Sequence, residues 1–225
     1  MEIIAHRGAS RERPENTLAA CERALEIGVD AIEVDLLLSK DQQLVVRHDD
    51  LLEVAGAWRY VHELTVEELQ RVDVGGGARI PRLEEVLERC YGRCPLILDL
   101  KADGIAQPLS DYLLAHRLTD HLHVASFLHD EIFAMGARCP TVQRSLTLTA
   151  LPMSFLELLR RSEVRDVNLS RSYVTRELMQ RLRDLDMRVR AYPVSVVREA
   201  QLFATWGVHG IFTPDPAAMQ ALRRG

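Results

Sequence analysis

Residues 6 to 49 of this 225-residue chain gather side chains that together can handle a phosphate ester. Histidines move protons near neutral pH, arginine holds an anion through a fork of N–H donors, and carboxylates hold a hard cation. All three kinds occur in the order His6-Arg7-Gly8, Pro14-Glu15-Asn16-Thr17, Glu33-Val34-Asp35 and His48-Asp49. We therefore predict a phosphate-ester site built around this segment.

Strand parity indicates that the two carboxylates of this segment share one face. Residues two apart on a β-strand point to the same side. In the predicted strand Ala31–Leu38, the side chains at 32, 34 and 36 are apolar, whereas Glu33 and Asp35 lie on the opposite face. Because the apolar face must pack beneath helices, the two carboxylates are expected to point inward.

The predicted strand Pro95–Lys101 repeats the pattern and places Asp99 and Lys101 on one face. Three inward carboxylates on neighbouring strands repel one another unless they are paired, and Lys101 can balance only one of them. A divalent cation resolves the repulsion, and oxygen-only ligands suit Mg²⁺ or Ca²⁺ better than zinc. The alternative is a salt-bridge cluster around Lys101. The predicted metal ligands are Glu33, Asp35 and Asp99.

The two histidines of the segment follow predicted strands. His6 comes directly after the first strand, and His48 follows the strand Leu44–Arg47, so both are expected at carboxyl ends of strands. One would serve as general base and the other as general acid in a displacement at phosphorus. Arg7 would hold phosphate oxygens, and Lys101 would stabilise charge in the transition state.

Strand-like and helix-like stretches alternate along the whole chain, which predicts an α/β protein with a mostly parallel sheet. Eight strands can be counted, each followed by a helix or by a segment long enough to hold one. At this length a (β/α)8 TIM barrel fits better than an open sheet, and the Gly-x-Gly-x-x-Gly turn of a dinucleotide-binding half is absent. Besides Ala31–Leu38 and Pro95–Lys101, the eight expected strands are Glu2–Ala5, His123–Ser126, Thr141–Leu146, Val164–Leu169, Arg188–Pro193 and Val208–Thr213, and the short strand Leu44–Arg47 comes in addition.

Residues 51–81 depart from this rhythm and contain the run Gly75-Gly76-Gly77. We interpret them as a small insertion or long loop between the second strand and its helix, which is expected to start near Arg82. The glycine run predicts a flexible turn, because the Lys-Ser/Thr of a P-loop does not follow it. A phosphate cradle is the alternative. Residues 1–225 are otherwise expected to form one barrel domain.

The composition excludes several classes of protein. The net charge of −5 argues against a nucleic-acid binder. No apolar run approaches the ~20 residues of a membrane span, and residues 1–5 are too short and too acidic for a signal peptide. We therefore expect a cytoplasmic protein without stable membrane insertion. A homodimer is compatible with the sequence. The four cysteines lack zinc-site spacing and are expected to be reduced thiols.

Taken together, these motifs resemble the signature of the glycerophosphodiester phosphodiesterase family, in its bacterial single-domain form. The similarity continues through Leu98-Asp99-Leu100-Lys101 and Ser126-Phe127, and it covers nearly the full chain, more weakly after residue 130. The resemblance implies a β/α barrel, a single divalent metal, and hydrolysis of glycerophosphodiesters to glycerol 3-phosphate and an alcohol. It also implies that the glycerol hydroxyl of the substrate attacks first and that water then opens a cyclic phosphate.

Carried over residue by residue, the resemblance implies that the three carboxylates predicted above are the metal ligands. It implies that His6 and His48 are the acid/base pair and that Arg7 and Lys101 contact the phosphate. Substrate contacts are further expected from Phe127 and Tyr192. The chain departs from the family pattern where Asp99 replaces the usual glutamate, and where Tyr192-Pro193-Val194-Ser195 replaces Trp-Thr-Val-Asn. These changes leave the catalytic set intact and leave the alcohol-side and glycerol-side specificity open.

Two other functions remain compatible with the sequence. One is a related barrel phosphodiesterase for lysophospholipids or phosphoinositide-type head groups, which would need an exposed apolar lip, around Ala55, Ala57, Trp58 and Tyr60 in the insertion. The other is a barrel that binds a phosphorylated ligand without turnover. Loss of a histidine or of two carboxylates would favour the latter, and neither loss occurs.

Overall fold

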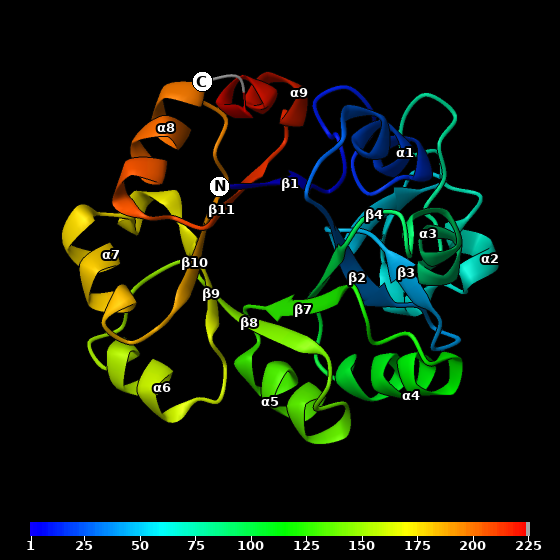
Figure 1. Cartoon of the computed structure of the whole chain (residues 1–225). Coiled ribbons are helices and arrows are strands. Elements are labelled where there is room, and N and C mark those ends of the chain that lie inside the picture. The colour runs from blue at the N-terminus through cyan, green and yellow to red at the C-terminus, as the bar shows by residue number, and fades with distance from the viewer. Residues whose placement is uncertain (224–225) are drawn as a thin grey trace.

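Eight parallel strands form a closed barrel in the computed structural model, which describes residues 1–223. The first strand pairs with both the second and the last, which closes the sheet on itself. Figure 1 shows the helices arranged around this barrel, so the predicted (β/α)8 fold is confirmed. The barrel strands are β1 (Glu2–His6), β2 (Ala31–Leu38), β6 (Leu96–Leu100), β7 (Leu122–Ser126), β8 (Gln143–Leu148), β9 (Asp166–Ser170), β10 (Arg188–Tyr192) and β11 (Gly210–Thr213).

A helix follows each barrel strand, and the sequence marks the ends of the first one clearly. The hydroxyl of Thr17 accepts a hydrogen bond from the Ala20 amide, and Gly28 ends the helix in the left-handed conformation. The helices are α1 (Leu18–Ile27), α3 (Leu83–Cys90), α4 (Ala106–His116), α5 (His129–Arg138), α6 (Phe155–Arg161), α7 (Arg176–Arg183), α8 (Val197–Trp206) and α9 (Pro216–Met219), with 3₁₀ turns η2 (Arg171–Tyr173) and η3 (Gln220–Arg223).

Alternation along the strands divides the core into two layers. Side chains such as Val34, Leu98 and Val167 face outward and pack with the helices in the main hydrophobic cluster. The opposite faces point into the barrel, where a small apolar cluster fills the middle. Its members are Ile4, Ala31, Ile97, Ala125 and Phe212. The polar side chains of the strand ends therefore meet above this apolar layer.

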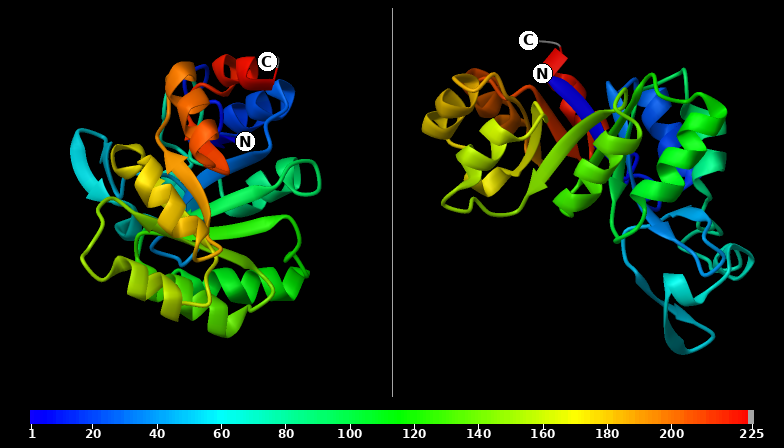
Figure 2. Two further views of the ribbon diagram at one scale, coloured as in Figure 1. Left: turned by 60° about the vertical axis from the view of Figure 1, so that its left-hand side comes forward. Right: turned by 90° about the horizontal axis from the view of Figure 1, so that it is seen from below.

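The segment between β2 and α3 leaves the barrel and holds a small core of its own. It comprises β3 (Leu44–Val46), β4 (Leu51–Val54), β5 (Ala57–Tyr60), η1 (Val61–Glu63) and α2 (Val66–Leu69). Figure 2 shows this cyan segment projecting away from the barrel. Buried residues that include Leu52, Leu64 and Leu69 hold it against Leu37 and Val45.

The strand before His48, β3, runs antiparallel to β2, so His48 does not follow a parallel barrel strand. After β3 the chain returns beside β2, where the Arg47 amide donates to the Asp35 carbonyl at 3.0 Å. This hairpin carries His48 to the same end of the barrel as His6.

The glycine run forms a turn. All three of its residues have positive φ, and the Asp73 carboxylate accepts hydrogen bonds from the amides of Gly75 and Gly77. Those two amides are already bonded, which disfavours the phosphate-cradle alternative.

None of the helices within residues 1–223 combines the length and the apolarity needed to cross a bilayer. The four cysteines are buried, and each is a free thiol in this part of the chain, as expected. Cytoplasmic location and homodimer formation stay predictions.

Candidate active site

A pocket of about 230 Å³ opens at the carboxyl ends of the barrel strands, where β/α-barrel enzymes hold their sites. It is lined by every predicted site residue except Asp35, which lies fully buried. The predicted residues in its wall are His6, Arg7, Glu33, His48, Asp99, Lys101, Phe127 and Tyr192.

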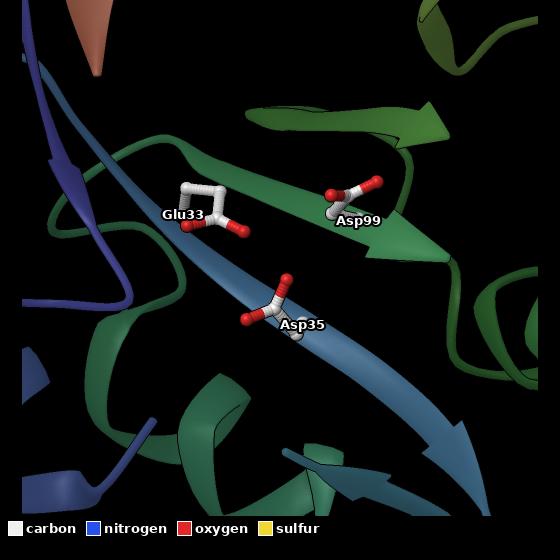
Figure 3. Close-up of side chains that lie close together, drawn as sticks. All are labelled: Glu33, Asp35 and Asp99. Atoms are coloured by element: carbon white, nitrogen blue, oxygen red, sulfur yellow. The ribbon is translucent and has the colours of Figure 1, made fainter. Parts of the chain in front are cut away.

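Three carboxylates converge beside this pocket, as the strand parity predicts. Glu33 and Asp35 come from β2, and Asp99 comes from the neighbouring β6, where it pairs in register with Asp35. One carboxylate oxygen from each residue lies within 4.8 Å of the others, and Figure 3 shows the three groups facing a common space. All three residues are at most 8% exposed.

Two cations of the protein form ion pairs with two of these carboxylates. Lys101 Nζ lies 2.7 Å from Asp99 Oδ2 and 3.0 Å from Asp35 Oδ1, and Arg7 Nε lies 3.2 Å from Asp35 Oδ2. Burial raises the pKa of Asp35, but Lys101 and Arg7 outweigh it, so the pKa ends below its ordinary value. A salt-bridge cluster around Lys101 is therefore part of the arrangement.

The pKa values of the other two carboxylates are raised instead. Burial, reinforced by the charges of Asp35 and Asp99, raises the pKa of Glu33 well above its ordinary value. Burial also raises the pKa of Asp99, to about 6. Within residues 1–223, Asp35 Oδ1 and Asp99 Oδ1 lack a partner in hydrogen-bond geometry. Three hard carboxylate donors, with Asp99 Oδ1 unpaired, fit a divalent cation such as Mg²⁺ or Ca²⁺.

Asn16 holds Asp35 in place. Its amide nitrogen donates to Asp35 Oδ2 at 2.7 Å, and its amide oxygen accepts from the Asp35 backbone N–H at 3.1 Å. The backbone of Asn16 is left-handed, with φ of 57°. This conformation turns the side chain back toward β2 one residue before the Thr17 cap.

The two histidines occupy different surroundings. His6 is close to Glu33, with 3.9 Å between His6 Nε2 and Glu33 Oε2. Burial and the positive charge of Arg7 lower the pKa of His6 to about 4, so its ring is neutral at pH 7. His48 lies at the rim, where its Nδ1 is 2.7 Å from Asp49 Oδ1. Asp49 therefore orients the ring and leaves Nε2 available for the pocket.

Arg7 is fixed from two sides in the same wall. Its guanidinium donates to both oxygens of Glu15, at 3.0 and 3.1 Å, and its backbone amide donates to Glu33 Oε2 at 2.8 Å. The next residue, Gly8, has φ of 75°, and a Cβ there would meet the Ala20 backbone at 2.6 Å. Only glycine allows this close approach between the Arg7 turn and α1.

Residues 6–218 match the glycerophosphoryl diester phosphodiesterase family. The chain belongs to this family. A glycerophosphodiester phosphodiesterase of Bacillus altitudinis is 30% identical over 233 residues, which cover 96% of this chain and 95% of that protein. Lysophospholipase D of Rattus norvegicus is 34% identical over 171 residues, covering 66% of this chain and 54% of the relative.

A solved structure gives the same fold. The phosphodiesterase of Oleispira antarctica, in complex with its product sn-glycerol-3-phosphate, superimposes with a TM-score of 0.90. The two are 24% identical, and the match covers 100% of this chain and 97% of that one. At this identity the likeness shows the fold of the family.

Three aromatic rings line the pocket at the carboxyl ends of β7, β10 and β11. Phe127 packs edge-to-face on Tyr192, and Tyr192 packs likewise on Phe212, with ring centroids 5.8 and 6.4 Å apart. Lys101 Nζ lies 5.0 Å from the Phe127 centroid. The Tyr192 hydroxyl donates to the Leu148 carbonyl at 2.9 Å, and burial raises its pKa. The Tyr192 hydroxyl therefore stays protonated at neutral pH and is engaged by Leu148, while the ring lines the pocket.

The pocket also contains residues that the sequence analysis missed. Thr147, Asn168 and Phe212 line it from β8, β9 and β11. Parity within Asp166–Ser170 carries the signal, since Val167 and Leu169 join the outer core and leave Asn168 facing inward. The sequence alone does not show which strand ends surround the pocket, so these three residues could not be assigned to it.

Proposed function

We propose that the protein hydrolyses glycerophosphodiesters to glycerol 3-phosphate and an alcohol, using one divalent cation and the His6/His48 pair. The observation that carries this proposal is the convergence of three buried carboxylates within 4.8 Å at a pocket that both histidines line. Family membership supports the reaction class.

Glu33, Asp35 and Asp99 would hold the cation. When bound, it would supply Lewis-acid stabilisation of charge on the phosphoryl oxygens. Lys101 and Arg7 add positive charge on the same side, and Arg7 is held by the Glu15 carboxylate in an orientation suited to an anion. The phosphodiester would therefore lie between the carboxylate trio and these two cations.

The histidines divide the proton transfers. His6 is neutral at pH 7, so we assign it the proton of the attacking hydroxyl, which is a hydroxyl of the substrate's own glycerol. His48, oriented by Asp49, gives a proton to the oxygen of the leaving alcohol. The new P–O bond closes a cyclic phosphate as the bond to the alcohol breaks. Water then opens the ring with the two proton transfers reversed.

Product analysis tests this proposal. Purified protein with Mg²⁺ or Ca²⁺ should release glycerol 3-phosphate from glycerophosphocholine and glycerophosphoethanolamine, together with choline or ethanolamine. Release of phosphocholine instead would assign the cleavage to the other ester bond and contradict the proposal. Binding of these diesters without turnover under any divalent cation would support the non-catalytic barrel.

One observation favours a second substrate class, the lysophospholipids. In the hairpin β4–β5 the side chains of Trp58 and Tyr60 are 67% and 45% exposed, as an apolar lip for an acyl chain would require. Release of choline from lysophosphatidylcholine micelles, lowered by Trp58→Ala while glycerophosphocholine turnover stays unchanged, would establish this class. Equal rates for the variant and the wild type on micelles would argue against a role for the hairpin.

A further inference from the structure

The deep end of the pocket has a floor that the proposed reaction leaves unassigned. Four lining residues there are at most 5% exposed, in contrast to Phe127 at the rim, which is 37% exposed. We call them the floor. They are Ala125, Thr147, Asn168 and Phe212. Ala125 and Phe212 are apolar, so the polar recognition at this depth rests on Asn168 and Thr147.

The amide of Asn168 is fixed on one side and has an unused atom on the other. Its nitrogen donates to Ser145 Oγ at 2.9 Å and to Thr147 Oγ1 at 3.2 Å, which occupies both N–H groups. Its Oδ1 has no hydrogen-bond partner within residues 1–223, although the residue is only 2% exposed. A buried polar atom left unpaired costs roughly 1–3 kcal/mol, so a ligand group that reaches it gains affinity.

The chemistry of the unpaired atom selects the ligand group. A carbonyl oxygen accepts a hydrogen bond and needs an O–H or N–H donor. If the amide is turned by 180°, Ser145 and Thr147 donate to the oxygen and the unused group becomes N–H. A hydroxyl both donates and accepts, so it satisfies Asn168 in either orientation.

In glycerophosphocholine, the glycerol part alone offers such a group. Ionised phosphate oxygens carry no proton, and the quaternary ammonium of choline has neither donor nor acceptor. Glycerol carries two hydroxyls, one of which is consumed as the attacking group under the proposed mechanism. The terminal hydroxyl is left for recognition.

We propose that Asn168, held by Ser145 and Thr147, is a specificity-determining residue that binds the terminal hydroxyl of the glycerol moiety. This inference rests on the proposed function. It places glycerol at the floor and the alcohol at the rim, beside Phe127 and the exposed Pro193. The enzyme then discriminates strongly on the glycerol side and tolerates different alcohols.

The test compares two substrates that differ only in this hydroxyl. Glycerophosphocholine has it, whereas the phosphocholine diester of propane-1,2-diol lacks it and keeps the attacking hydroxyl. We expect the wild type to prefer glycerophosphocholine by roughly tenfold or more in kcat/KM, the effect of one lost hydrogen bond in a buried site. Equal kcat/KM values would overturn the assignment to Asn168, while the proposed function would stand. Turnover of neither substrate would refute the proposed function itself.

Two variants test whether Asn168 causes the preference for glycerophosphocholine. Asn168→Leu keeps a similar side-chain size without the amide, and its preference should fall below about threefold, mainly through loss on glycerophosphocholine. Ser170→Ala changes the next residue on the same face of β9, outside the pocket lining, and should keep the wild-type ratio. An unchanged preference in Asn168→Leu, or an equal loss on both substrates, would overturn the assignment.

A binding measurement on the wild type covers the case in which Asn168→Leu does not fold. Glycerol 3-phosphate should bind at least roughly tenfold more tightly than the phosphate of propane-1,2-diol in isothermal titration calorimetry with Mg²⁺. Equal affinities would contradict the role of the floor.

Discussion

The side-chain amide of Asn16 makes two hydrogen bonds to Asp35, one to its carboxylate at 2.7 Å and one from its backbone N–H at 3.1 Å. The second bond fixes the amide against the strand, and the first fixes Oδ2 of the carboxylate. Asp35 Oδ1 is then the oxygen that faces Lys101. Asn16 therefore positions a predicted metal ligand without being one.

Replacement of Asn16 by glycine should weaken metal binding. Glycine tolerates the φ of 57°, so the variant removes the amide with little backbone strain. Loss of a residue that orients a ligand typically lowers metal affinity by about 10–100-fold. Activity titrated with Mg²⁺ should show that increase in the activation constant. Gln42→Gly is the matched control, because Gln42 has a φ of 58° at an exposed position outside the pocket. Equal activation constants for Asn16→Gly and the wild type would remove the positioning role.

Alanine at either predicted catalytic histidine should lower kcat by at least ~100-fold, the low end for general acid–base catalysis. His6→Ala removes the neutral ring that accepts the first proton, and His48→Ala removes the ring that Asp49 orients. His116→Ala serves as control, since His116 stacks on Tyr112 on the exposed side of α4. Steady-state rates on glycerophosphocholine check this, and near-normal turnover by His6→Ala or His48→Ala would exclude the assigned role.

His123 should make the protein less stable as the pH falls. Burial, with the charge of Arg190, lowers its pKa to about 3 in the folded protein, compared with about 6.5 when unfolded. Between these values the unfolded chain binds a proton that the folded chain does not. The free energy of unfolding should therefore drop by about 2 kcal/mol from this residue alone between pH 7.5 and pH 5.

The comparison of wild type with His123→Gln isolates this contribution, because all other titrating groups are common to both. Urea unfolding at the two pH values should show a loss about 2 kcal/mol smaller in the variant. Identical pH dependence in the two proteins would mean that His123 does not stay neutral when buried.

A methyl group at Gly210 should destabilise the amino-terminal end of the barrel. A Cβ there would lie 3.1 Å from Glu2 Cβ and 3.3 Å from Arg190 Cγ. Neither side chain moves freely, because Arg190 Nε lies 3.0 Å from Glu2 Oε2 and Arg190 Nη1 lies 2.8 Å from Asp166 Oδ1. Overpacking of this kind costs about 1–3 kcal/mol, or roughly 2–12 °C in Tm for a chain of this length. A melting curve of Gly210→Ala within 1 °C of the wild type would show that the ion pairs rearrange without penalty.

The sequence predicts the barrel and the carboxylate cluster because both depend on local alternation. Apolar residues at every second position of Ala31–Leu38 fix which face packs on helices, and the same holds for the strand that carries Asp99. Glu33, Asp35, Asp99 and Lys101 could therefore be placed in one space before the fold was seen, and the structure brings them together.

Other parts of the site depend on information that alternation does not contain. The pattern of Leu44–Val46 is the same for a parallel and an antiparallel strand, so the return of β3 beside β2 could not be predicted. Asn16 reads as part of a helix start, and only its left-handed backbone aims the amide at Asp35. Asn168 required knowledge of which strand ends surround one pocket.

Removal and return of the metal ion shows whether catalysis depends on it. The protein is freed of metal with chelator, and glycerol 3-phosphate release from glycerophosphocholine is followed as Mg²⁺ or Ca²⁺ is added back, with binding stoichiometry measured in parallel. We expect no activity without the ion, recovery with one ion bound per chain, and loss of that binding in Asp35→Asn. Full activity in chelator, or unchanged metal binding by Asp35→Asn, would contradict this expectation.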